Sequence, residues 1–499
     1  MGWFSSGALA RFAAPVSGIR PRTGRLPGVL LLLILLFGAT GCVSYRTQTN
    51  AMNSAWERGD PERSARLASQ LAGAREGTRD EVIWRLEEGS THRVAGQWTE
   101  SMRAFDQATD LIRQWDDRPP VLVGQELTAS LTNLSHLPYR GYAYDRIMLH
   151  TYQALNAMHL EQWERARVEF NRALQAQRDA VDANARRIER EREAIREQSR
   201  QSSAGSGERG FDPDRAAGDA RFQRQFDRVY QGLDEMSAYA DYVNPFAVYL
   251  DGLFFKFRPD TAADLERARV SLRRVAGMVP GNTAVQEDLA GIEELLQGRG
   301  HPPLTYVIFE TGQGPLREEV RIDFPLYLFS GDVPYVGAAF PQLRFRGNYL
   351  PVLNVRAGGQ NWPTQTVARM DAVIAREFAD ELPLVTTKTL AAAGVQAAAV
   401  YGLREAARRE SQTFGALVNL AGMIYQYAMN QADLRQWSTL PKEFQIARFP
   451  TPEDRVVELF TTGRDPIRRL ELPPGQVHLI LIRSITPQSP LHLSLLTLK

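Results

Sequence analysis

The sequence predicts a multidomain protein with two unlike parts: an all-α part made of helical hairpins, followed by an α+β part with antiparallel strands and an inserted helical hairpin. Three observations lead to this prediction. Residues 44–300 repeat apolar side chains at helical spacing, residues 301–499 contain short β-branched and aromatic runs between turns, and an alanine-rich stretch interrupts those runs. With 499 residues, the chain is long enough for two or three domains.

The helical part contains units in which a small, a large and a small residue follow one another at spacings of four and three. The three clearest units are Ser101, Phe105 and Ala108; Ala166, Phe170 and Ala173; and Ala268, Leu272 and Val275. A weaker half-unit follows Gly59, and Gly252 lies on the helix expected to partner the third unit. These spacings place side chains on one helix face, where small residues allow a second helix to approach. The pattern resembles tetratricopeptide repeats, but its spacing is irregular, so generic helical hairpins are the alternative.

A highly charged run divides the helical part. Opposite charges lie three and four residues apart over 180–200, which favours an exposed helix, although a partner-binding arm is the alternative. Residues 201–207 predict a flexible break, and helical character resumes near Asp219. We therefore predict tetratricopeptide-like helices over 42–180, a charged helix and flexible linker over 181–225, and a second helical segment over 226–300.

The α+β domain is expected over 301–499. Strands are predicted at 305–310, 318–323, 342–346, 352–356, 455–460, 476–483 and 491–498. Helices are predicted near 364–381, 386–409 and 411–430. Neither apolar run of this insertion reaches the ~20 residues of a membrane span, and Gln396 and Asn419 interrupt them, so a buried hairpin is favoured over membrane-inserting helices.

The N-terminus predicts export. The apolar run Val29–Phe37 is too short to cross a bilayer core of ~30 Å, but it fits the apolar region of a signal peptide. The run leads to Ala39, Thr40, Gly41 and Cys42, which resemble the recognition sequence of signal peptidase II, with Ala39 in the place where Leu is usual. This resemblance implies a signal peptide over 1–41 and a diacylglyceryl group on Cys42, which anchors the protein to the membrane. The residue after Cys42 is Val43 and not Asp. By analogy with enteric lipoproteins, this favours the outer membrane, with the protein facing the periplasm.

Composition excludes several functional classes. One cysteine allows neither an internal disulfide nor a multi-thiolate metal site. Removal of residues 1–41 takes the formal net charge from +1 to −3, which argues against nucleic acid as a partner. The seven histidines lack metal-ligand spacing, and phosphate-loop, dinucleotide-binding and nucleophile-elbow motifs are missing from the sequence. Neighbouring acids such as Glu87 and Glu88 would point to different faces of a helix, a poor arrangement for acid–base catalysis. We therefore expect no enzyme, no catalytic residues, no metal and no cofactor.

Three segments carry a resemblance to a known family. They begin with Asn244-Pro245-Phe246, Met370-Asp371-Ala372 and Ala432-Asp433-Leu434, and they resemble an uncharacterised family of Gram-negative lipoproteins with tetratricopeptide-like helices. The resemblance implies a role at the cell envelope. Members of this family are often found near lipoproteins that are similar to activators of penicillin-binding proteins. The first hypothesis is an interaction scaffold that binds an envelope protein through helical repeats. The alternatives are a regulator of a peptidoglycan-synthesising enzyme and an envelope enzyme with an unrecognised site.

The third of these segments also contains candidate anchors. On an extended chain Asp433, Arg435 and Trp437 share a face. A guanidinium stacked on the indole would be a structural lock between the helical insertion and the sheet. An exposed anchor for a partner is the alternative.

Overall fold

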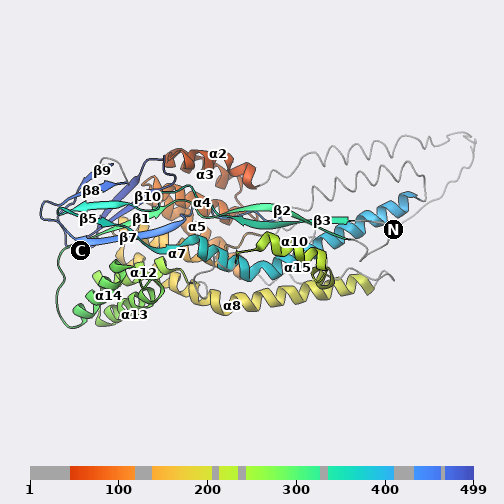
Figure 1. Cartoon of the computed structure of the whole chain (residues 1–499), viewed down its shortest axis with the longest axis horizontal. Coiled ribbons are helices and arrows are strands. Elements are labelled where there is room, and N and C mark those ends of the chain that lie inside the picture. Colours follow the sequence, from red (N-terminus) through yellow and green to blue (C-terminus); the bar gives the residue numbers. More distant parts are fainter. Residues whose placement is uncertain are drawn as a thin grey trace, which may run out of the picture. The chain divides into compact units, whose positions relative to one another are not determined.

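The computed structural model describes residues 45–117, 138–204, 213–233, 243–325, 335–408, 432–461 and 467–499. Residues 43–499 form one compact unit, distinct from residues 1–42. Helices dominate up to residue 296 and strands follow from residue 304, so the predicted order of an α part and an α+β part is confirmed (Figure 1). The predicted boundaries at 180, 225 and 300 therefore lie within one compact unit.

Three helical hairpins open the chain. They pair α2 (Tyr45–Glu57) with α3 (Pro61–Ala74), α4 (Glu81–Val94) with α5 (Trp98–Asp116), and α7 (Ala143–His159) with α8 (Trp163–Ala204). The same turn connects each pair. Gly59, Gly96 and Glu161 have φ angles of 74°, 74° and 57°, and the next amide in each turn donates to the carbonyl five residues earlier. A residue with a left-handed backbone commonly ends a helix. Because the same turn joins each pair of helices, similar sequence units recur along this part of the chain.

A further helical group consists of α12 (Pro245–Phe257), α13 (Ala262–Met278) and α14 (Thr283–Leu296). Asn244 caps α12, because its side-chain oxygen accepts hydrogen bonds from the amides of Phe246 and Ala247. A Cβ atom at Gly252 would lie 2.8 Å from Cγ of Leu272, which is closer than carbon atoms pack. The small residue at 252 therefore permits the close contact between α12 and α13 that the sequence pattern predicts.

The strands form two larger sheets and one two-stranded ribbon. The five-stranded sheet has the order β11-β10-β1-β7-β6, the four-stranded sheet has the order β5-β4-β8-β9, and β2 pairs with β3. The strand bounds are β1 Leu304–Thr311, β2 Leu316–Pro325, β3 Tyr335–Arg344, β4 Asn354–Ala357, β5 Gln360–Pro363, β6 Gln365–Arg369, β7 Glu443–Pro450, β8 Val456–Phe460, β9 Arg468–Glu471, β10 Val477–Ser484 and β11 His492–Thr497. Pairing is antiparallel as predicted, apart from the parallel pair of β1 and β10.

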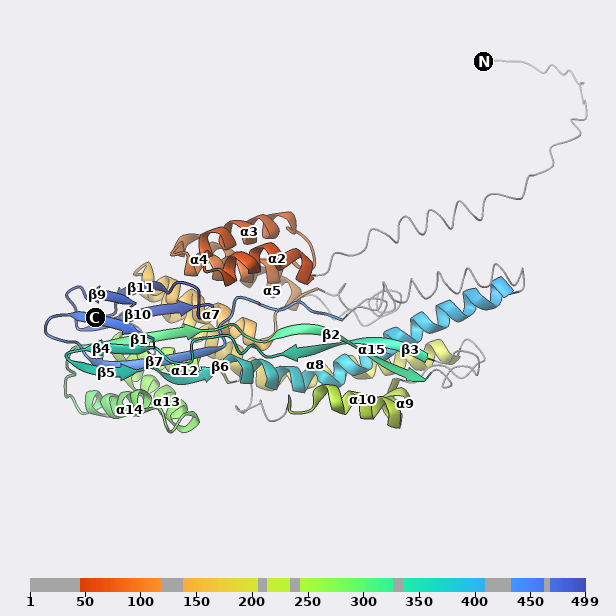
Figure 2. The same ribbon diagram turned by 45° about the horizontal axis from the view of Figure 1, so that its top comes forward.

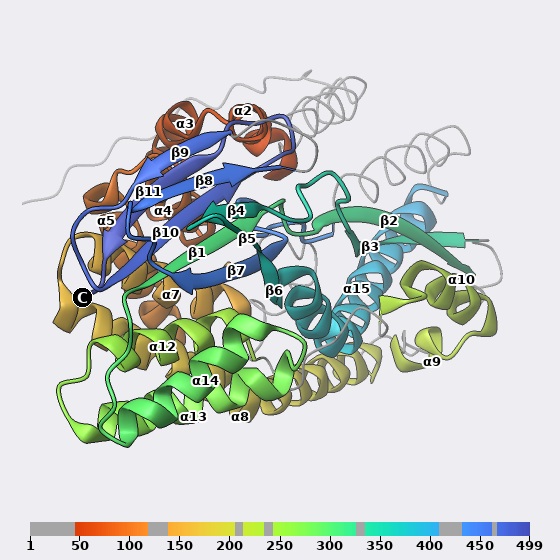
Figure 3. The same ribbon diagram turned by 60° about the vertical axis from the view of Figure 1, so that its left-hand side comes forward.

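The five-stranded sheet is the middle layer, with both faces covered. Tyr306 and Ile308 of β1 face the core formed with the helices, whereas Val307 and Phe309 face the core shared with the four-stranded sheet. This is the period of two of a strand, and burial on both faces explains why β1 and β10 are apolar on both sides. Figure 3 shows the helices α12–α14 on one side of this sheet and β4, β5 and β8 on the other.

Long elements extend from these layers. Helices α8 and α15 (Met370–Arg408) run side by side, and the β2–β3 ribbon packs on α15 together with α9 (Pro213–Ala217) and α10 (Ala220–Tyr230) (Figures 1 and 2). Phe222 of α10, Phe340 of β3 and Leu390 of α15 share one apolar cluster.

The charged run is a largely exposed helix as predicted, but Ile188 and Ile195 of α8 pack against Leu384 and Ala391 of α15. The flexible break is corrected. The run remains helical to Ala204, beyond the predicted start of the flexible break at 201, and residues 205–207 lie outside the described part.

The insertion also differs from the prediction. Residues 365–369 are strand β6, and a single helix continues through Pro383 in place of separate helices at 364–381 and 386–409. A proline inside a helix normally costs stability, but packing of α15 on α8 and β3 offsets this cost. The predicted helix at 411–430 lies outside the described residues. Among the helices that the structure describes, none is sufficiently long and apolar to traverse a bilayer.

The remaining differences concern strands. The prediction missed β7, which lies between β1 and β6 in its sheet, and the short strands β5, β6 and β9. In β7, the polar Gln445 is almost fully buried, with its side-chain amide hydrogen-bonded to Thr364 and to the carbonyl of Pro351. Tertiary partners far along the chain satisfy these polar groups, and a local pattern does not contain that information.

Candidate functional site

The predicted lipid site, Cys42 with Ala39, Thr40 and Gly41, lies outside the described residues. The candidate anchors of the third resemblance segment are described. The segment 432–442 leads into β7 and contacts the first helical hairpins. Its contacts define one candidate site, and the outer groove of those hairpins defines another.

Asp433 and Arg435, which the sequence pattern places on one face, form an ion pair. Nη2 of Arg435 lies 2.6 Å from Asp433 Oδ2, and Nη1 lies 2.6 Å from Asp80 Oδ1. Burial would raise the pKa of Asp433, but the Arg435 guanidinium holds it below its ordinary value. The guanidinium lies 5.5 Å from the ring of Tyr139. The pair therefore connects the segment to the helices, and the ring beneath the arginine is Tyr139, not the expected Trp437.

Trp437 is inserted between the hairpins. Its side chain is 3% exposed, and Nε1 donates a hydrogen bond of 2.8 Å to Ser90 of α4. The edges of Phe105 and Tyr152 meet its ring at centroid distances of 5.7 and 5.9 Å. Such a buried indole contributes mainly to packing. The geometry fits a structural lock, but the lock connects the 432–442 segment to α4, α5 and α7.

Glu87 of α4 is the main acceptor for this segment. Its carboxylate accepts hydrogen bonds from the amide and hydroxyl of Ser438 at 2.6 and 2.7 Å and from the hydroxyl of Thr439 at 2.7 Å. Burial raises the pKa of Glu87, although these donors partly counteract the rise. The neighbouring Glu88 pairs with Arg85, which confirms that adjacent acids on this helix face different partners.

The end of strand β1 carries a second buried charge. Glu310 is 1% exposed and forms an ion pair with Arg93 of α4, whose guanidinium lies 3.9 Å from the ring of Tyr152. Arg483, at the end of the parallel strand β10, donates to the carbonyls of Ser484 and Glu310. Burial lowers the pKa of Arg483 to about 10, although the negative charge of Glu310 partly opposes this shift. These contacts fasten α4 to the sheet.

A third buried cluster attaches α12 and α14 to the sheet. Asp288 accepts hydrogen bonds from Lys256 at 2.9 Å, from Tyr306 and Tyr249 at 2.6 Å each, and from Arg448 at 3.1 Å. Burial would raise the pKa of Asp288, but Lys256 and Arg448 hold it below its ordinary value. Four donors on one carboxylate leave little room for a substrate, so this cluster is structural.

Two of the segments that carry the family resemblance meet, and Lys442, the residue after the third segment, joins them. The side-chain amide of Asn244 lies 3.4 Å from the sulfur of Met370, and the next residue, Asp371, forms an ion pair with Lys442. Asp371 is 2% exposed, and burial raises its pKa. Segments far apart in the sequence thus share one junction between α12, α15 and the start of β7.

The accessible candidate site is a groove of about 550 Å³ between α5 and α8. Both helices contribute charged residues to its lining: Asp106, Asp110, Arg113, Glu164, Arg165, Glu169 and Arg172. Arg165 bridges the two helices to Asp106 at 2.5 Å. His150 of α7 lies behind the groove, with Nδ1 2.8 Å from Glu169. Val168 in the groove is 44% exposed. An open groove with both charge signs suits a polypeptide partner better than a small apolar ligand.

No metal centre is indicated. In the part of the chain that the structure describes, histidine, cysteine, aspartate and glutamate side chains do not gather in threes at metal-binding distance. Sequence reasoning did not identify Glu87, Glu310 or Asp288 as members of buried clusters. Single buried acids give no local signal, because their partners lie elsewhere in the chain.

Comparisons with known proteins add no relative. No protein-family model, no curated protein and no solved structure matches the chain.

Proposed function

We propose that the mature chain is a lipid-anchored protein of the bacterial outer membrane, facing the periplasm, that holds another envelope protein in the groove between α5 and α8. The export signal that ends at Cys42 supports the anchor. The hairpins α2–α3, α4–α5 and α7–α8, with their common turn, support tetratricopeptide-like repeats as the binding scaffold.

The open groove is the observation that carries this proposal. In both hairpins that form it, the first helix, α4 or α7, packs inward and is almost completely buried. The second helix, α5 or α8, presents charged side chains outward to the groove. The buried acids, in contrast, are occupied by donors from within the fold. The covered inner helices and the open, charged lining of the groove leave α5 and α8 accessible to a protein partner.

A charge exchange within the groove tests the proposal. Asp110 and Arg113 lie one turn apart on α5 with exposed side chains, and their charged atoms are 3.9 Å apart. The double variant Asp110→Arg, Arg113→Asp keeps the net charge and the internal pair but reverses the charge pattern that a partner meets. We expect the lipidated variant, cross-linked in the envelope, to lose the proteins that the wild type recovers.

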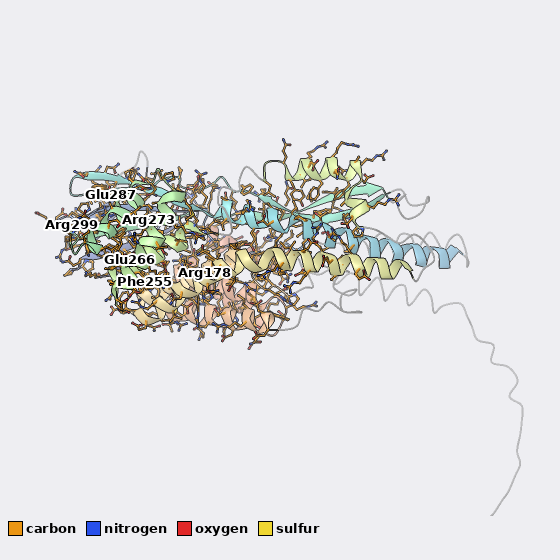
Figure 4. All side chains as sticks on the ribbon, turned by 90° about the horizontal axis from the view of Figure 1, so that it is seen from below. Arg178, Phe255, Glu266, Arg273, Glu287 and Arg299 are labelled. Atoms are coloured by element: carbon orange, nitrogen blue, oxygen red, sulfur yellow. The ribbon has the colours of Figure 1, made fainter. Side chains whose placement is uncertain are left out.

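A matched control is available on α13 and α14. Arg273 and Glu293 form a similarly exposed pair at 2.9 Å, and Figure 4 shows Arg273 on the outer surface of α13. The variant Arg273→Glu, Glu293→Arg should recover the same proteins as the wild type. Equal recovery with the groove variant would contradict binding in the groove. A peptidoglycan-synthesising enzyme among the recovered proteins would support the regulator hypothesis.

The anchor has a separate test. Cys42→Ser removes the thiol that would take the diacylglyceryl group. We expect the variant to keep residues 1–41 and to lose fatty-acid labelling, both of which mass spectrometry detects. Cleavage and acylation that persist in Cys42→Ser would contradict a lipid anchor at this residue.

A further inference from the structure

The folded part of the chain begins very close to the proposed anchor. Helix α2 starts at Tyr45, only three residues after Cys42. A trans peptide chain spans at most about 3.6 Å per residue, so the Cα atoms of Cys42 and Tyr45 are at most about 11 Å apart. A lipid anchor on Cys42 would therefore hold the first turn of α2 next to the membrane surface.

The start of α2 is firmly attached to the rest of the fold. The hydroxyl of Tyr45 donates a hydrogen bond of 2.8 Å to the carbonyl of Gln436, and its ring lies 5.1 Å from that of Trp84. Met52 and Trp56 of the same helix are fully buried. Because the helix cannot turn independently of the hairpins, a short connection to the membrane also orients the whole compact unit.

The surface around this turn has an excess of positive charge. Arg46 of α2 and Arg344 at the end of β3 are 53% and 52% exposed. Both bind the same carboxylate oxygen of Glu318, at 3.0 and 2.7 Å. One carboxylate therefore faces two guanidinium groups. Exposed arginines with uncompensated charge are suited to bind phosphate groups.

A third arginine lies beside this pair. Arg346 follows Arg344, is largely buried, and lies 3.6 Å from Glu57 at the other end of α2. Arg346 is therefore matched by its own acid, and the excess positive charge of this surface lies on Arg46 and Arg344, which share Glu318.

We propose that the surface formed by the first turn of α2 and the end of β3, with Arg46 and Arg344, lies on the membrane and contacts the phosphate groups of anionic lipids. This inference rests on the proposed lipid anchor at Cys42. It adds an orientation: the protein is not suspended on a flexible tether, and one defined face is held on the bilayer.

The single cysteine of the chain allows a direct test. In the lipidated protein the thiol of Cys42 is blocked, so a cysteine introduced elsewhere is the only free thiol. Thr47→Cys places a fluorophore on the exposed side of the first turn of α2, and Val270→Cys places it on α13, where Val270 is 62% exposed. Each labelled protein is reconstituted in vesicles that contain phosphatidylglycerol and an acceptor dye on the lipid headgroups.

We expect energy transfer to the headgroups to be much higher from position 47 than from position 270. Arg46→Glu with Arg344→Glu should increase the transfer from position 270, because a body without this contact can tilt on its anchor while position 47 stays near Cys42. Salt at 1 M, which shortens the screening length to about 3 Å, should have the same effect. The matched control, Arg273→Glu with Arg299→Glu, reverses two arginines of similar exposure, each paired with an acid, and should preserve the difference.

The outcomes separate the two proposals. Protein that does not remain with the vesicles would overturn the lipid anchor itself. Protein that remains attached but transfers energy equally from both positions would overturn the membrane-contact surface. A difference that is preserved in Arg46→Glu, Arg344→Glu and in phosphatidylcholine vesicles would overturn the contact with anionic lipids.

Discussion

Asp288 and Glu87 are both completely buried where helices meet other elements, yet the fold satisfies them in different ways. Asp288, under α12–α14, is neutralised by two cations, Lys256 and Arg448. Glu87, under α2 and α4, receives only neutral donors from Tyr45, Ser438 and Thr439. Burial disfavours the charged form in both places, but a nearby cation reverses that effect and a hydroxyl only reduces it.

The pKa directions follow this difference. The pKa of Asp288 lies below its ordinary value, whereas that of Glu87 lies above it. Two other acids belong with Glu87. Asp145 accepts from the hydroxyl of Tyr139 and the amide of Tyr142, and Glu377 accepts from two amides at the start of α7. Burial raises the pKa of both. The acid between α12–α14 and the sheet thus stays ionised as the pH falls. The acids around α4 and α7 take up a proton more readily than they do in water.

The largest expected effect is at the cation-neutralised acid. Asp288→Asn removes the negative charge and leaves Lys256 buried beside Arg448. Breaking a buried ion pair by removing one partner costs about 3–5 kcal/mol. Denaturant unfolding should show a loss of this size, and a loss below about 1 kcal/mol would mean that the cluster is not neutralised as described.

A smaller loss is expected at the acid held by neutral donors. Thr439→Val keeps the shape of the side chain but removes one hydrogen bond to Glu87. A hydrogen bond to a charged group contributes about 1.5–3 kcal/mol. The same unfolding measurement checks this value, and Thr439→Ser, which restores the hydroxyl, should recover most of the stability.

A pH-dependent effect distinguishes the two classes of acid. Burial raises the pKa of Asp145 to about 7 from the ordinary 3.8, so the folded state binds more protons than the unfolded state between these values. The contribution of Asp145 to stability is therefore present at low pH and is lost as the pH rises toward 7. Asp145→Asn should remove this slope, which is at most about 1.4 kcal/mol per pH unit. Parallel stability curves for the variant and the wild type from pH 5 to 7 would contradict a raised pKa.

The smallest effect is expected at the edge of the Asp288 cluster. Glu287, labelled in Figure 4 on α14, pairs with Arg448 but is 51% exposed. Glu287→Gln should cost less than about 1 kcal/mol, because water screens an exposed pair. A loss comparable with that of Asp288→Asn would show that Arg448 depends on its outer partner.

The comparison also explains how much the sequence alone could predict. The hairpins and the strands β1 and β10 have local signals, namely residues of period 3.6 or continuous apolar runs. That Asp433 and Arg435 share a face was predicted because they lie two residues apart, but their ion pair was not predicted. The acceptors Glu87 and Asp288 were not predicted, because their donors Ser438 and Arg448 are supplied by the other part of the chain. The groove between α5 and α8 likewise depends on how two hairpins pack together.

The hydrogen bond from Tyr45 to Gln436 has a consequence for how the chain is made. These residues are 391 positions apart, and Arg435 and Ser438 reach Asp80 and Glu87 across similar separations. At roughly 5–20 residues per second, the first hairpins wait about 20–80 s for the segment that completes their packing. Contacts between residues so far apart in the sequence form slowly during folding. Until translation supplies residues 432–442, the pocket of Trp437 is an unfilled apolar surface, and we expect chaperones to bind the nascent protein there.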